Sequence, residues 1–115
     1  MASHRVGRLN EDFKREISAI LSSMKDSRVN EFLSVTRVEV TSDLSYAKVY
    51  IGSLKGYEHA TDACPVLAAA QGHIKSCLAK KLRIRKIPSL QFIADDAVEY
   101  YYKIQNILEG MQDEH

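Results

Sequence analysis

The feature that most constrains the fold is a pair of alternating segments separated by a short turn. In each segment every second residue is apolar or small, and the intervening residues are mostly polar. The positions that share the inner face are Thr36, Val38 and Val40, followed by Ala47, Val49 and Ile51. Residues 42–45 leave room only for a hairpin, so the two strands are predicted to be antiparallel. Their shared face is aliphatic and needs a layer of helices to bury it.

Three other segments carry apolar side chains at steps of three and four residues, the spacing of amphipathic helices. They are residues 5–24, residues 61–82 and a segment that follows residue 96. Residues 25–32 and 53–60 lack such a period, and both are predicted to be loops.

The helix ends are predicted from capping residues. Thr61 or Asp62 suits the start of the second helical segment, in which Pro65 falls in the first turn. Asp95 or Asp96 suits the start of the last helix, and glycine at position 110 suits its end. The final residues, 110–115, are expected to fray.

The second helical segment contains a predicted break at Ala70, Gln71 and Gly72. A glycine inside a helix costs about 1 kcal/mol relative to alanine, so a kink, or the close approach of another backbone, explains Gly72 better. Pro88 stops the helical pattern, and residues 90–94 form a third, apolar strand. Because a helical excursion precedes it, this strand can run parallel to a neighbour. The predicted order is α-β-β-α-kink-α-β-α, with a three-stranded mixed sheet and helices packed on one face.

Length and composition predict one domain over residues 1–115, and the predicted order of helices and strands makes it α+β. A chain of 115 residues with 45% hydrophobic and 27% charged residues has enough apolar material for one core. The formal charge is only +1, but the charges are segregated. Cations concentrate in residues 75–86, whereas acids dominate residues 95–115. The proposed contacts with a polyanion are Lys75, Lys80, Lys81, Arg83, Arg85, Lys86 and His73, joined by Arg5, Arg8 and Arg15 of the first helix.

The sequence contains no pattern that predicts catalysis, a metal site or a cofactor. Its four histidines are scattered, and no phosphate-binding glycine motif is present. The paired carboxylates of Asp95 and Asp96 are better explained as helix caps. Cys64 and Cys77 are interpreted as small apolar residues of a reduced compartment. The first residues have no apolar signal region, and no uncharged run is long enough to span a bilayer, so we expect a cytoplasmic protein.

The chain resembles the ribosome-binding factor A family of bacterial small-subunit maturation factors. The two most specific segments are VEVTSDLSYAKVYI, in residues 38–51, and LRIRKIPSLQF, in residues 82–92. Weaker matches include Arg8, residues 15–17 and residues 25–28. The resemblance covers nearly the whole chain in the same order.

The resemblance implies a type II KH-like fold in which an Ala-x-Gly kink, here residues 70–72, replaces the usual GxxG turn. It also implies a non-catalytic factor that binds the free small (30S) ribosomal subunit and its 16S rRNA, and not assembled ribosomes. Such a factor would assist late rRNA processing. We expect a monomer with no membrane partner and no cofactor.

Two other functions remain open at this stage. The first is a free-standing KH-type protein that binds single-stranded RNA with base preference. The second is a protein-interaction adaptor that uses the acidic C-terminal helix.

Overall fold

A computed structural model describes residues 2–24, residue 29 and residues 33–113. The predicted loop at residues 25–32 therefore lies outside the described residues, apart from Val29, which is buried. The order of elements along the chain is as predicted. The elements are α1 (Ala2–Ser23), β1 (Leu33–Val40), β2 (Tyr46–Ser53), α2 (Tyr57–Ala69), α3 (Gln71–Leu82), β3 (Ser89–Ala94) and α4 (Ala97–Asp113).

The three strands form one mixed sheet in the order β1-β2-β3. β1 and β2 are antiparallel, and β3 runs parallel to β2, which confirms both predictions. Three alternate residues of the central strand, Ala47, Val49 and Ile51, are completely buried. The predicted inner face of the second strand is therefore confirmed.

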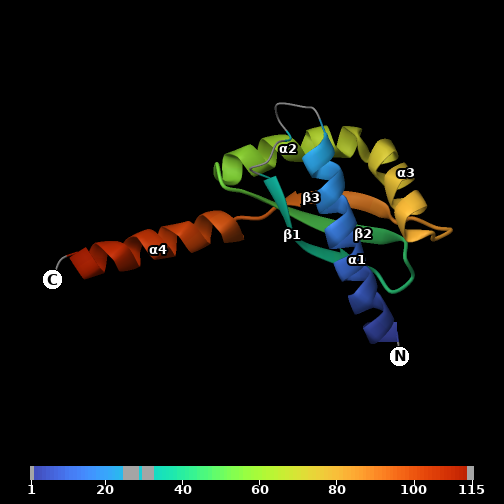
Figure 1. The fold of residues 1–115 in the computed structure, drawn as a ribbon, viewed down its shortest axis with the longest axis horizontal. Helices are drawn as coiled ribbons and strands as arrows, with labels where there is room; N and C mark the ends of the chain where they lie inside the picture. The colour runs from blue at the N-terminus through green and yellow to red at the C-terminus, as the bar shows by residue number, and fades with distance from the viewer. Residues whose placement is uncertain (1, 25–28, 30–32, 114–115) are drawn as a thin grey trace.

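Three helices cover that inner face (Figure 1). α1 buries Phe13 and Ile17, α2 buries Leu67, and α3 buries Ile74 and Leu78, all in one cluster with the strands. None of the helices that the structure describes covers the opposite face of the sheet (Figure 1).

A β-bulge interrupts β1 between Val35 and Arg37, and it changes the predicted position of Thr36. Val38 and Val40 are buried as predicted, but Thr36 is only half buried. Its hydroxyl donates a hydrogen bond to the carboxylate of Asp95 and also lies 3.3 Å from the backbone oxygen of Tyr50. The extra residue reverses the alternation, so buried positions are odd-numbered before the bulge and even-numbered after it.

α2 begins four residues before the predicted cap at Thr61, so the prediction of a loop through residue 60 is wrong. The helix follows Gly56, whose φ of 114° strongly favours glycine. Ala60 is fully buried, in line with Ala63 and Leu67. The start of α2 has no side-chain cap, so no capping residue marks it in the sequence. As a result of the earlier start, Pro65 lies inside the helix and not in its first turn, where it was predicted.

The break between α2 and α3 lies at Ala70 rather than at Gly72. Ala70 has φ −90° and ψ 7°, and its backbone oxygen accepts the first hydrogen bond of α3 from Ile74. Gly72 lies in the first turn of α3 and is exposed. A Cβ atom added there would meet nothing within 4 Å, so no described part of the chain approaches this glycine.

α4 projects away from the rest of the domain (Figure 1). The radius of gyration is accordingly 16.1 Å, whereas a compact chain of this length has about 13 Å. At the start of α4, the carboxylate of Asp95, one of the two predicted caps, accepts a 2.9 Å hydrogen bond from the N–H of Ala97, the first residue of the helix. The predicted end at position 110 is wrong, since the helix continues to Asp113. The apolar side chains of α4 that the structure describes are exposed, and they are Tyr101, Ile104, Ile107 and Leu108.

Candidate nucleic-acid interface

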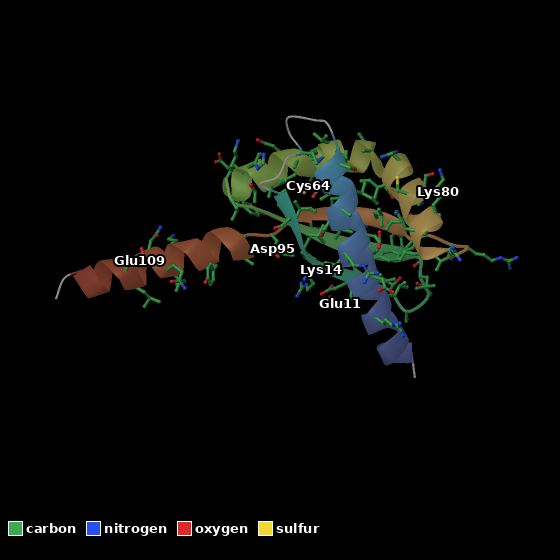
Figure 2. All side chains as sticks on the ribbon, in the orientation of Figure 1. Glu11, Lys14, Cys64, Lys80, Asp95 and Glu109 are labelled. Atoms are coloured by element: carbon green, nitrogen blue, oxygen red, sulfur yellow. The ribbon has the colours of Figure 1, made fainter. Side chains whose placement is uncertain are left out.

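Most of the predicted basic residues lie where α3 ends. Lys80 and Lys81 occupy the last turn of the helix, where cations interact favourably with the helix dipole. Arg83 follows as the C-cap, and Arg85 and Lys86 lie in the segment that leads to β3. All five side chains are exposed. Figure 2 shows Lys80 on the outside of α3.

The backbone of this segment directs its cations outward. Arg83 has a left-handed conformation, with φ 53° and ψ 41°, and this turns the chain out of the helix. Ile84 and Ile87 then pack against the core, and Pro88 is fully buried. Because the apolar residues are held inward, Arg85 and Lys86 remain in solvent.

The residues predicted within α3 divide between two sides of the helix. His73 and Lys80 are seven residues apart, which is about two turns, so they lie on the same side. Cys77 lies between them, with its sulfur 3.7 Å from Nε2 of His73. Lys75 is half buried and lies on another side, because it is about one and a half turns from Lys80. The structure thus groups His73 with Lys80 and separates Lys75 from them.

The arginines of α1 differ in their surroundings. Arg8 is exposed. Arg15 is held by two carboxylates of its own helix, those of Asp12 at 3.3 Å and Glu16 at 3.4 Å. The side chain of Arg5 lies outside the described part of the structure. The positive charge of Arg15 is therefore partly balanced locally.

The cations at the end of α3 have no such counter-charges among the described residues. The ion pairs of Arg15 and Arg37 lie elsewhere, on α1 and β1. The start of α3 also has free capacity for an anion, because its N-cap is Ala70, which has no capping side chain. The first turn of α3 contains no acidic residue. We name Lys80, Lys81, Arg83, Arg85 and Lys86 the basic segment.

The uncovered face of the sheet had no predicted role, although the alternation of β2 places Lys48 and Tyr50 there. On this face the guanidinium of Arg37 lies 4.4 Å from the centre of the Tyr50 ring. Its Nε atom is 3.2 Å from a carboxylate oxygen of Glu39. A hydrogen bond to the Tyr50 side chain, with the charge of Glu39, raises the pKa of Arg37. Tyr46 is half exposed on the same face.

Contacts that resemble catalytic pairs have structural explanations. Oγ of Ser53 lies 2.5 Å from Nδ1 of His59 and also accepts a hydrogen bond from the N–H of Lys55. Since Ser53 is buried, this pair fastens the start of α2 to the end of β2. Burial raises the pKa of the Cys64 thiol, which makes it less reactive. Among the described residues no group of three potential metal ligands occurs, and none of their helices is long and apolar enough to cross a membrane.

Comparison with known proteins gives one consistent result. The family model described as ribosome-binding factor A matches residues 5–108. A relative named ribosome-binding factor A from Clostridium botulinum is 38% identical in an alignment of 115 positions, which covers 98% of this chain and 99% of that protein.

Solved structures agree with this match. The crystal structure of ribosome-binding factor A from Thermus thermophilus superposes with a TM-score of 0.68 at 26% identity, covering 77% of this chain and 94% of that one. A homology model of the Thermus thermophilus factor, fitted into a cryo-EM map of its complex with 30S, superposes with a TM-score of 0.62 at 26% identity, covering 73% and 88%.

Proposed function

The chain belongs to the ribosome-binding factor A family, and we propose that it is a non-catalytic maturation factor for the small ribosomal subunit. In this proposal it binds the free 30S subunit and its 16S rRNA through the basic segment, and it assists late rRNA processing. It acts as a monomer in the cytoplasm and does not bind assembled ribosomes. The fit of the related Thermus factor into a map of a 30S complex supports the choice of partner.

The observation that carries the proposal is the group of exposed, unpaired cations at the end of α3. Cations held in solvent without counter-charges are free to neutralise phosphates, and each neutralised phosphate releases condensed counterions. Affinity for rRNA should therefore fall steeply as salt increases. Folded rRNA is recognised largely by shape and by exposed strands, which suits a basic surface on a rigid helix.

The start of α3 supplies a second contact in this proposal. Helix N-termini favour anions, because their first N–H groups lack intrahelical acceptors. The space beside Gly72 is open, and His73 lies in the same first turn of α3. His73 is also on the same side of the helix as Lys80, about two turns away. A phosphate at this turn would continue the path of the RNA backbone from the basic segment. Lys75 would contact the RNA only if the RNA strand also passed along the other side of α3.

One alternative has its own structural support. The exposed apolar side chains of α4, including Tyr101 and Leu108, favour a protein-interaction adaptor. An adaptor that works through α4 would not depend on the basic segment. A free-standing binder of single-stranded RNA would instead require tight, base-specific binding to short oligomers.

Co-sedimentation with purified ribosomal particles tests the proposal. We would compare the wild type with Lys80→Glu/Lys81→Glu over a series of salt concentrations. Lys14→Glu/Lys103→Glu is the matched control, because it reverses two charges on α1 and α4. The expected result is salt-sensitive binding to free 30S and not to assembled ribosomes, lost in the first variant and retained in the control.

Other outcomes would redirect or reject the proposal. Equal binding by both double variants would place the contact away from α3. Binding that is independent of salt and lost on truncation of α4 would support the adaptor. Failure of the wild type to bind 30S would reject the maturation role.

A further inference from the structure

A hollow of about 460 Å³ opens where the end of the sheet meets the start of α4. Its volume is within the range of small-ligand sites. It lies at the opposite end of the domain from the basic segment, as the positions of Asp95 and Lys80 in Figure 2 show. The lining residues come from β1, β2, α2 and the β3–α4 connection, and they are Thr36, Arg37, Tyr50, Tyr57, Ala94, Asp95, Asp96 and Ala97.

Planar groups form one part of the lining. The guanidinium of Arg37 stacks over the ring of Tyr50, and the Arg37 side chain is 60% exposed. Tyr57 contributes a ring that is 46% exposed. Unstacked RNA bases pack on aromatic rings and on guanidinium planes of this kind. The hollow therefore has surfaces on which a base can stack.

Carboxylates form the other part. Asp95 is held in place because its two oxygens accept hydrogen bonds from the Thr36 hydroxyl and the Ala97 N–H. Asp96 is adjacent and exposed. An ionised carboxylate only accepts hydrogen bonds and can accept two parallel ones. A ligand at the Asp96 carboxylate must therefore present donors, and a pair of adjacent donors fits it best.

The charges and flat surfaces of the lining favour a neutral, planar ligand. The carboxylates of Asp95 and Asp96 oppose a phosphate, and the charge of Arg37 is already balanced by Glu39 at 3.2 Å. A neutral, planar group with a donor edge can stack on the Arg37 guanidinium and donate to a carboxylate. Among the RNA bases, guanine presents two adjacent donors, N1–H and the N2 amino group, on its Watson–Crick edge.

We propose that this hollow binds one unpaired guanine of a single-stranded RNA segment. The base stacks on Arg37 and Tyr57, and its Watson–Crick edge donates to the Asp96 carboxylate. The adjoining backbone follows the uncovered sheet face, where Lys48 meets a phosphate and Tyr46 offers a further stacking surface. The inference rests on the proposed function in taking RNA as the partner, but it assigns a second contact that is separate from α3.

The test uses the full chain and RNA pentamers that differ only in the central base: UUGUU, UUAUU and UUCUU. Affinity is measured by fluorescence anisotropy, and the contact is located by amide chemical shifts. The expected result is about tenfold tighter binding of the guanine pentamer, the discrimination typical of a two-hydrogen-bond base contact. Amide shifts should change around residues 36–37, 50, 57 and 94–97.

Two variants separate this site from the basic segment. Asp96→Asn replaces one acceptor oxygen by a donor and should abolish the guanine preference, while the matched control Asp62→Asn on α2 should retain it. Lys80→Glu/Lys81→Glu should weaken 30S binding and leave the guanine preference of the pentamers intact. If the wild type binds 30S but shows no guanine preference, this inference fails and the proposed function stands.

Two other results would overturn the inference. Equal affinity for the three pentamers with no shift changes at the hollow would exclude a base site. Shift changes at the hollow caused by a lysine- and arginine-rich peptide, and not by RNA, would assign the hollow to a basic protein partner.

Discussion

The side-chain amide oxygen of Gln71 accepts a 2.8 Å hydrogen bond from the backbone N–H of Leu90. Leu90 belongs to the edge strand β3, in which the N–H groups of the neighbouring odd-numbered residues point toward β2. The N–H of Leu90 therefore points away from β2, toward the open edge of the sheet. The bond joins the first residue of α3 to this open edge, and it fixes the helix that carries the basic segment relative to the sheet.

Gln71→Met tests that bond, because methionine keeps the length of the side chain and removes the strong acceptor. We expect the free energy of unfolding to fall by about 1 kcal/mol, the usual contribution of one hydrogen bond. The N–H of Leu90 should also exchange faster with solvent. Urea unfolding and amide exchange measure both effects. Gln91→Met, at an exposed position of β3, is the control, and equal stability of the two variants would contradict the assigned role.

Arg83→Gly should stabilise the fold and weaken RNA binding. A left-handed conformation costs a non-glycine residue about 1 kcal/mol or more, and glycine adopts it freely. We therefore expect the free energy of unfolding to rise by about 1 kcal/mol, while affinity for 30S falls through the lost cation. Arg85→Gly removes a charge of the same segment outside the helix cap, so it should lower affinity without the gain in stability. A loss of stability in Arg83→Gly would contradict this account.

Gly72→Ala distinguishes a structural role of the glycine from a role in binding. The added methyl group meets nothing in the described chain, and alanine favours helix. The free energy of unfolding should be unchanged or rise by up to about 1 kcal/mol. If an rRNA backbone approaches the start of α3, the methyl group should nevertheless weaken co-sedimentation with 30S. Ser76→Ala, at an exposed position of α3, is the control. Unchanged 30S binding by Gly72→Ala would remove this turn from the proposed contact.

Asp43 should make the hairpin turn sensitive to acid. Its carboxylate accepts hydrogen bonds from the hydroxyls of Ser45 and Thr41 and from the N–H of Ser45, which lower its pKa from 3.8 to about 2. Because the pKa is lower in the folded state, the stabilisation is present above about pH 3.8 and is lost as the pH falls toward 2. The wild type should be more stable than Asp43→Asn at pH 7, and the difference should shrink toward pH 2.

Carboxyl NMR titration measures the same effect directly. Ser45→Ala removes the largest cause of the shift and should raise the pKa of Asp43 toward its ordinary value. Asp62→Asn, on the surface of α2, serves as the stability control. A pKa of Asp43 that does not respond to Ser45→Ala would contradict the hydrogen-bonded turn.

The hairpin and the helical stripes were predictable, because their signals are local. Burial of Val49 and Ile51 follows from a period of two, and burial of Ile17 and Ile74 follows from the helical period. The bulge at Thr36 and the start of α2 at Tyr57 were missed. Both depend on backbone geometry that no side-chain period records: an extra residue in one strand, and a helix that begins after a glycine with positive φ.

The sequence alone determined the order of the elements, the inner face of the sheet and the position of the basic segment, because each depends on residues close together in the chain. Only the tertiary structure decided which cations lack counter-charges, where Gln71 anchors α3, and that α4 leaves its apolar side chains exposed. Only the tertiary structure also brings Arg37, Tyr50, Tyr57 and Asp96 around one hollow. These residues come from four segments, and no local pattern encodes a distance between segments that meet only when the core packs.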